Sequence, residues 1–460
     1  MGSDFDSMTA SPDSAVTVLR SPSPAIFALA LWATISTLIA VAALFGGMGA
    51  VILVLAAGLG VYVWRRPEEA PGAGLLFLFA AQILLPFSAR FVYQSSDTSR
   101  MYYWATGLLI ITVAAVMRLS LRRVFDVPLS AKVFLGVALA SAVHAEAQGA
   151  ATSYVVRQFY GILLLVVYFG IALHAGDEEL LLRRARTFGC VCALAFLAYY
   201  VAVFGEYGFH REMGTNGTQA SMFAILLVIA GVSARKISWV LSAVVPLLVP
   251  ALLFMRRDLL TFLVALPIAL VVRSRTWKLR LAYCVLAVLL ALPGVYPSLA
   301  QSVGDQLKRA PIIGEVLPST TENAASLYDR AVQAGVALNA LRTHPWLGEG
   351  LGAGFEFETA FHGPVETVYV DSGWAYLFQK TGLVGAVAFL WFLITVFAGF
   401  SRESPGLTAC LVSAALVTTF SEPVFFHFTT APFVGTFAGL LLARKDRVCK
   451  AAALTRGQVS

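Results

Sequence analysis

Long apolar runs constrain this chain more than any other feature of its sequence. An α-helix rises 1.5 Å per residue, so about 20 apolar residues cross the hydrocarbon core of a bilayer. These runs are apolar on every side, whereas strands of a membrane barrel would alternate apolar and polar residues. We therefore expect an all-α, polytopic membrane protein with about 12–14 transmembrane helices. The fourteen candidate runs cover approximately 25–44, 46–64, 72–88, 101–117, 128–146, 154–173, 187–205, 218–233, 237–255, 259–272, 279–296, 373–400, 405–420 and 424–443.

The composition excludes a soluble globular protein. Hydrophobic residues make up 58% of the 460 residues and charged residues only 13%, whereas soluble domains contain about 25% charged residues. The net charge of +7 is typical of a membrane protein with basic cytoplasmic loops, and we expect no nucleic-acid partner. The five cysteines form no CxxC pair, so we expect neither a zinc site nor a disulfide.

The lysines and arginines of the connecting loops predict the orientation. Short loops rich in these residues mark the cytoplasmic side of a membrane protein, and the basic loops of this chain fall on alternate connections. With fourteen spans, both termini are expected to be cytoplasmic. The expected parts are a disordered cytoplasmic tail (1–24), transmembrane helices 1–11 (25–296), one large outer loop (297–372), transmembrane helices 12–14 (373–443) and a basic cytoplasmic tail (444–460).

The large outer loop, 297–372, is the one long hydrophilic stretch. It holds four basic and nine acidic residues, a net charge of −5. Ser319 and Glu322 have the spacing of a capping box, and Pro345 sets the end of the helix that follows. We expect an amphipathic helix over roughly 320–343, lying on the outer membrane surface or over a cavity. Its apolar stripe would be Leu327, Ala331, Ala334, Leu338 and Leu341.

Arginines on the predicted outer side are candidate ligands for an anion. Arg256 and Arg257 stand between two apolar runs with almost no loop, and Arg211 stands at the mouth of a helix. Guanidinium groups bind phosphate oxygens bidentately and stay charged at any accessible pH. A plainer role stays open for each, because Arg256 and Arg257 could snorkel from a hairpin tip and Arg211 could lie in a surface loop.

The end of the large loop carries the most distinctive local sequence. The segment HPWLGEGLGAGF at 344–355 is too irregular for a dinucleotide-binding fingerprint, so we expect a tight turn that returns the chain to the membrane. Asp371 then opens an apolar helix, where it could be an N-cap or a general base. His344 is the rival base, although a histidine before proline could equally be part of the turn.

The order of these pieces resembles the O-antigen polymerase and ligase family, the Wzy-type polymerases and lipopolysaccharide O-antigen ligases. The family's blocks are Arg-x-x-Gly, a Ser-Arg run before two leucines, Arg…His-Pro-x-x-Gly-x-Gly, and His-Asn…Gly-Leu-x-Gly. The pattern covers a little over a third of the chain. The matching positions are Arg211 with Gly214, Arg256 or Arg257 before Leu259-Leu260, Arg330 before His344-Pro345 and Gly348-x-Gly350, and Asp371 before Gly382 and Gly385.

The resemblance implies a reaction on the periplasmic side of a bacterial inner membrane, in which a glycan moves from undecaprenyl pyrophosphate to an acceptor hydroxyl. It implies no metal or cofactor. The implied partners are the undecaprenyl-pyrophosphate-linked oligosaccharide, the lipid bilayer, a chain-length regulator and a flippase. The implied roles are pyrophosphate binding by Arg211, Arg256 and Arg257, a further phosphate or sugar contact by Arg330, and proton removal from the acceptor by Asp371, with His344 as the alternative base.

One departure from the family pattern separates the alternatives. Asp371 and Ser372 stand where ligases usually have His-Asn, which favours a polymerase of O-antigen or exopolysaccharide over a ligase that would use the lipid A core. A transporter or lipid-glycan flippase would favour charges near the bilayer midplane, whereas these ionisable residues cluster at helix ends. A metal-dependent membrane glycosyltransferase would be expected to carry an acidic pair in its first outer loop, but 45–49 has no charge.

Overall fold

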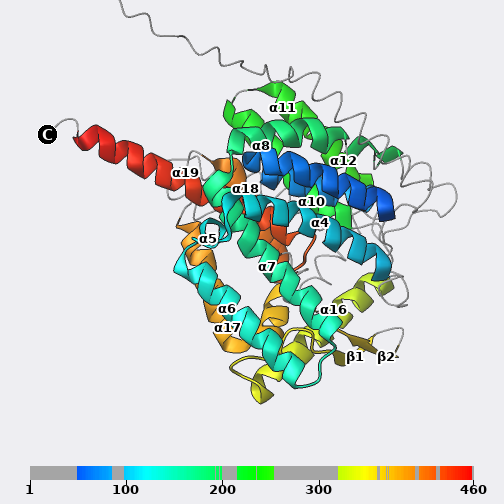
Figure 1. The fold of residues 1–460 in the computed structure, drawn as a ribbon. Coiled ribbons are helices and arrows are strands. Elements are labelled where there is room, and N and C mark those ends of the chain that lie inside the picture. The colour runs from blue at the N-terminus through cyan, green and yellow to red at the C-terminus, as the bar shows by residue number, and fades with distance from the viewer. Residues whose placement is uncertain are drawn as a thin grey trace, which may run out of the picture.

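The computed structural model of the chain is mostly helical (Figure 1). It describes residues 49–84, 98–191, 193–195, 197–198, 215–234, 236–252, 320–359, 363–368, 370, 372–398, 404–420 and 425–457. Three of the described helices are long and apolar enough to cross a membrane: α6 (Leu129–Ala147), α7 (Thr152–Ala175) and α17 (Gly373–Phe397). The chain therefore has the character of a membrane protein, as its composition predicts.

The remaining described elements are shorter or less apolar. An apolar helix covers Gly49–Arg65. It is followed by η1 (Pro67–Glu69), α2 (Ala70–Leu84), α4 (Thr98–Leu119), α5 (Leu121–Val124), α8 (Glu178–Arg184), the π-helical turn η2 (Ala185–Gly189), α10 (Thr215–Ala234), α11 (Ile237–Ser242), α12 (Val244–Leu252), α16 (Thr320–Thr343), β1 (Phe355–Thr359), β2 (Gly363–Thr367), α18 (Pro405–Phe420) and α19 (Ala431–Gly457).

Helices α7 and α19 pack side by side at the centre of the bundle. A Cβ atom on Gly435 would meet the backbone of Leu165, and one on Gly439 would meet the backbone of Phe169. Small residues of this kind let helix backbones approach closely where lipid replaces water as the solvent. Because higher numbers in α19 meet higher numbers in α7, the two helices run in the same direction.

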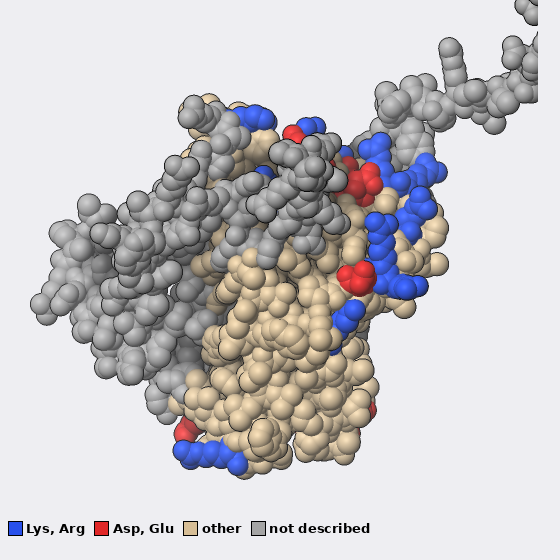
Figure 2. Space-filling model, turned by 90° about the vertical axis from the view of Figure 1, so that its left-hand side faces the viewer, with Lys and Arg blue, Asp and Glu red and all other residues tan. Residues whose placement is uncertain are grey.

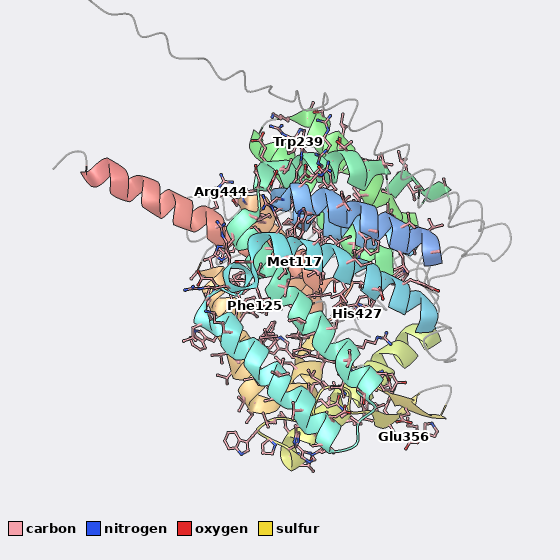
Figure 3. The ribbon with its side chains drawn as sticks, in the orientation of Figure 1. Met117, Phe125, Trp239, Glu356, His427 and Arg444 are labelled. Atoms are coloured by element: carbon pink, nitrogen blue, oxygen red, sulfur yellow. The ribbon has the colours of Figure 1, made fainter. Side chains whose placement is uncertain are left out.

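One end of the bundle, here called the basic end, is held by ion pairs. Arg184 pairs with Glu69 at 2.5 Å, and Arg444 pairs with Glu178 at 2.7 Å. Figure 2 shows Lys and Arg side chains gathered at this end of the described surface, above a broad band that lacks charged residues. In Figure 3, Arg444 lies at the opposite end of the molecule from Glu356.

The other end, here called the loop end, is formed by the α6–α7 connection and the turn at 344–354. Helix α6 runs toward it and α7 starts from it, whereas α17 reaches it at its middle, where a Cβ on Gly382 would meet Trp346 of the turn. Two hydrogen bonds fix α6 antiparallel to α17: Ser130 Oγ donates to Thr395 Oγ1 at 2.9 Å near the basic end, and Ser141 Oγ donates to the Lys380 carbonyl nearer the loop end.

A β-hairpin in the large loop departs from the all-α prediction. Strands β1 and β2 pair antiparallel, with Phe355 opposite Thr367 and Glu356 opposite Glu366. Phe355 and Phe357 are buried while Glu356 and Glu358 are exposed, which is the alternation of a strand with one face on a core. The alternation from Phe355 to Glu358 is present in the sequence and is typical of a strand, but the sequence prediction includes no strand there.

Helix α16 covers the range predicted for an amphipathic helix, but over 332–343, where its side chains are described, it buries a partly different face. Leu338, expected in the apolar stripe, is 49% exposed, whereas Gln333, Ala337 and Ala340 are buried. The buried face is the one that packs on α17 and β1. The predicted stripe is therefore wrong at Leu338, because tertiary contacts rather than helix periodicity decide which side faces inward.

Three further helix bounds differ from the sequence prediction. Residues 425–430 form turns, so the last apolar helix begins at Ala431 rather than near 424. The same helix continues to Gly457, through much of the range predicted as a tail. The run predicted at 237–255 is divided into α11 and α12 at Ala243.

Candidate functional site

The predicted site residues are unequally covered by the structure. Arg211, Arg256, Arg257 and Asp371 lie outside the described residues. Arg330 is a helical position of α16, one turn before Gln333, and its side chain is outside the described part. His344 is described with its side chain. The structure therefore describes the helices next to these residues in the sequence, rather than most of the residues themselves.

Helix α17 is broken at Gly382, nine residues after its start. Gly382 has φ 61° and ψ −162°, a conformation that no helix contains. Side chains are strained at such a positive φ, and a Cβ here would also meet the Trp346 carbonyl. The break divides α17 into a first half, 373–381, and a second half, 383–397.

The turn at 344–354 occupies the break and takes over its backbone hydrogen bonds. In an unbroken helix Leu383 N–H would donate to Gln379 and Val384 N–H to Lys380. Instead they donate to the Pro345 and Trp346 carbonyls, at 2.9 and 3.2 Å. The freed Gln379 carbonyl accepts from Glu349 N–H at 2.7 Å, and the freed Lys380 carbonyl accepts from the Ser141 hydroxyl.

Polar side chains of the first half of α17 hold the same turn. Gln379 Nε2 donates to Glu349 Oε2 at 2.8 Å, and Lys380 Nζ donates to the Ala353 carbonyl. The Lys380 nitrogen also lies 5.9 Å from the ring centroid of Phe355. Both Gln379 and Lys380 are fully buried, at 0% exposure. Buried ionisable groups are costly in a membrane protein and usually have a specific task.

Helices α6 and α7 complete the seat of the turn. Leu351 N–H donates to Ser141 Oγ at 3.1 Å, and Gly352 N–H donates to Gln158 Oε1 at 2.7 Å. Gln158 Nε2 in turn donates to the Val368 carbonyl at 2.8 Å, so one side chain joins the turn to the end of the hairpin. A Cβ on Gly350, whose φ is +96°, would collide with Ala145.

His344 lies at the junction between α16 and the turn. Its backbone N–H donates to the Ala340 carbonyl at 2.8 Å, and its own carbonyl accepts from Gly348 N–H at 3.1 Å. Its ring is exposed, with Nδ1 3.1 Å from the Thr343 hydroxyl and the ring centroid 6.5 Å from that of His144. The backbone of His344 therefore has a structural role in forming the turn, whatever its ring does.

The N-cap of α17 is Ser372, whose hydroxyl accepts from Ala375 N–H at 3.5 Å. An N-cap side chain satisfies one of the free N–H groups at a helix start. Ser372 takes the capping role that the sequence left open for Asp371.

A segment before α19, residues 425–430, connects the starts of several helices. Gln219 Nε2 in the second turn of α10 donates to the Thr429 carbonyl at 2.8 Å. Tyr376 in the first turn of α17 stacks on Phe426, with ring centroids 5.5 Å apart. His427 Nδ1 lies 2.7 Å from Thr429 Oγ1, and Figure 3 shows His427 within the bundle, away from Glu356 on the hairpin.

This arrangement favours negative charge near the helix starts. The first turn of a helix presents free N–H groups and a partial positive charge, so anions bind there readily. Helices α10 and α17 both begin near 425–430. The first N–H groups of α19 are not free, because those of Ala431, Phe433 and Val434 donate to the His427 and Thr430 carbonyls. Within the described part of the chain, no three His, Cys, Asp or Glu side chains come together as they would around a metal ion.

Gln158, Ser141 and Lys380 hold the turn, and none of them has a role in the sequence prediction. Each is a polar residue inside an otherwise apolar run, which is the signal that could have identified them. A comparison with models of known protein families finds no match, and no curated protein matches the chain either.

Proposed function

We propose that this chain is a polysaccharide polymerase of the bacterial inner membrane. It would transfer a glycan from undecaprenyl pyrophosphate to a sugar hydroxyl of another lipid-linked repeat, on the periplasmic side. The proposal rests on the order of the sequence motifs that contain Arg211, Arg256 or Arg257, Arg330 and Asp371. Its structural support comes from the helices that follow two of these residues.

The observation that carries the proposal is the meeting of α10 and α17 at the segment 425–430. Arg211 precedes α10 by four residues, and Asp371 precedes α17 by two. The early turns of both helices contact the same segment, through Gln219 with Thr429 and through Tyr376 with Phe426. A proposed pyrophosphate ligand and a proposed base, far apart in sequence, thus flank helices that meet.

The chemistry assigns different tasks to these two kinds of residue. Negative charge develops on the leaving pyrophosphate, and Arg211, Arg256 and Arg257 would stabilise it by charge-assisted hydrogen bonds. The acceptor hydroxyl loses its proton as it attacks the donor sugar, and the Asp371 carboxylate would take that proton. Free N–H groups at the helix starts would add to the favourable field.

We assign Arg330 and His344 to the path by which substrate would reach the proposed site of glycan transfer. Both belong to the segment formed by α16 and the turn, which packs on α17. Arg330 would contact phosphate or sugar, and His344 is the alternative base. The exposed Glu356, Glu358 and Glu366 of the hairpin are acceptors that sugar hydroxyls could use.

A transporter is the alternative that one structural observation favours. Broken membrane helices often line transport sites, where their free backbone groups bind ions or substrate. In α17, however, the N–H groups of Leu383 and Val384 and the carbonyls of Gln379 and Lys380 are bonded to other protein groups. This favours a fixed scaffold over a transport site at the break.

A genetic test separates the polymerase from the ligase. In a deletion strain that makes only single-repeat glycans, the gene should restore a ladder of long chains. Attachment of single repeats to the lipid A core without a ladder would favour the ligase, and restoration of neither would count against both enzymes.

Matched variants test the assigned residues in the same strain. Asp371→Ala and Arg256→Ala should each abolish the ladder at normal protein levels. The controls are Asp126→Ala and Arg122→Ala, because both residues are exposed near the basic end. Full ladders from both site variants would contradict the proposed mechanism.

A further inference from the structure

We propose that Lys380 is a positioning residue for glycan transfer: it clamps the end of the turn against α17 and so fixes the direction of the first half of that helix. The inference rests on the proposed function, because it takes the first half of α17 to carry the base Asp371 at its start. Lys380 itself touches no substrate in this proposal.

The break in α17 makes such a clamp necessary. Two consecutive helical hydrogen bonds, from Leu383 and Val384, leave the helix for the turn. Helix continuity therefore does not set the angle between the halves, and Gly382 has few backbone restraints of its own. The direction of the first half then depends on how the turn is held and on the packing between the halves, where the Trp374 ring lies 5.9 Å from that of Phe389.

The turn is attached to α17 near its start and at its end. Near the start, the Pro345 and Trp346 carbonyls accept from the second half of the helix, and Glu349 is bonded to Gln379. At the end, Lys380 Nζ of α17 donates to the Ala353 carbonyl. The same nitrogen lies over Phe355, the first residue of the hairpin.

A lysine is an expensive choice for this position. Burial of an ionisable side chain at 0% exposure carries a large desolvation cost, and an apolar residue of similar length would avoid it. Met or Leu could fill the space but could not bind the Ala353 carbonyl. Because Lys380 is costly to bury, its role is best explained by the position in which its bond to the Ala353 carbonyl holds the turn.

A tilt of the first half would reach the proposed centre directly. Tyr376 lies one turn before Lys380 on this half and stacks on Phe426. Phe426 belongs to the segment that also binds Gln219 of α10. Loss of the clamp should therefore misalign the base relative to the donor without removing any group that binds it.

The test compares the wild type, Lys380→Met and Lys380→Gln in full-length protein. For each, kcat and KM for undecaprenyl-pyrophosphate glycan are measured, together with hydrogen–deuterium exchange of the peptides covering 345–354. We expect kcat to fall at least tenfold with KM within twofold, and exchange in 345–354 to rise at least tenfold while that of 431–443 stays unchanged. Lys132→Met, an exposed lysine of α6, is the matched control and should match the wild type in both.

The outcomes separate the two proposals. If the wild type transfers no glycan, the proposed function fails, and the exchange data still decide whether Lys380 clamps the turn. If the wild type is active, a variant with unchanged kcat, or with a raised KM alone, overturns the positioning role. Unchanged exchange in 345–354 overturns the clamp. If the Lys380→Met protein does not accumulate in cells, the same measurements are made on Lys380→Gln.

Discussion

The backbone N–H of Leu383 donates to the carbonyl of Pro345 at 2.9 Å, although an unbroken helix would send it to Gln379. The turn at 344–354 thus replaces part of the hydrogen-bond ladder of α17. Because unpaired backbone groups are costly away from water, the turn and the helix stabilise each other.

Replacement of Gly382 should destabilise the protein. At φ 61° and ψ −162°, a region that essentially only glycine occupies, a Cβ costs on the order of 1–3 kcal/mol, and this Cβ would also meet the Trp346 carbonyl. We expect Gly382→Ala to lower the melting temperature of detergent-solubilised protein by several degrees. Gly136→Ala is the control, because a Cβ at Gly136 meets nothing within 4 Å; equal melting temperatures for both variants would contradict the account of the break.

Gln158 should be required for the seat of the turn. It bonds the Gly352 N–H and the Val368 carbonyl, at 2.7 and 2.8 Å. Gln158→Leu would leave both backbone groups without this partner, at a cost of about 1–3 kcal/mol for each buried group. Hydrogen–deuterium exchange should accelerate in 345–354 and 363–368. Gln148→Leu, at an exposed glutamine, should leave exchange there unchanged, and the idea fails if the two variants behave alike.

The basic end should depend on pH through Glu69. Burial alone would raise the pKa of Glu69, but hydrogen bonds from Arg184 and Tyr62 outweigh it and hold the pKa below its ordinary value. Its stabilising effect is therefore complete above the ordinary carboxyl pKa and is lost as the pH falls through the lowered value. Glu69→Gln should cost about 1–3 kcal/mol at neutral pH, less than a fully buried pair because Arg184 is partly exposed.

The pH profile of melting temperature checks this lock. The difference between the wild type and Glu69→Gln should be constant from pH 6 to 8 and shrink at acid pH, below the ordinary value of 4.5. Glu68→Gln, next to it and exposed, should differ little from the wild type at any pH. A gap between Glu69→Gln and the wild type that widens toward acid pH would contradict the assignment.

Local signals explain what could be predicted of the fold. The apolar runs at 128–146, 154–173 and 373–400 correspond to α6, α7 and α17 within a few residues. The amphipathic helix at 320–343 has the bounds that the following His344-Pro345 indicates. The length of an apolar run and the position of a proline are local features of the sequence, so the helices that depend on them can be predicted from it.

The insertion of the turn into α17 could not be predicted in the same way. It depends on contacts between residues far apart in the chain, such as Pro345 with Leu383 and Ser141 with Lys380. The sequence feature that corresponds to this insertion is the polar run at 379–381 inside an apolar helix. A burial pattern such as that of α16 likewise depends on which neighbour the helix meets.

The residues of the proposed site were predicted from sequence motifs. For two of them, Arg211 and Asp371, the structure describes the helices that follow, α10 and α17. Ser372 caps α17, so Asp371 is not needed as the cap. The contacts of Gln219 and Tyr376 bring the starts of α10 and α17 to one segment, which no motif spacing could have indicated. The assignment of Arg211, Arg256 and Arg257 to pyrophosphate stays a prediction.

The most direct test of the central claim gives purified protein a synthetic undecaprenyl-pyrophosphate glycan, without added metal, and measures polymer and released undecaprenyl pyrophosphate together. We predict that the wild type forms both in step, and that Asp371→Asn lowers the rate at least about 100-fold, as expected for loss of a general base. Asp126→Asn should keep the wild-type rate. The claim is contradicted if the wild type forms no polymer from this donor, or if Asp371→Asn forms it as fast as the wild type.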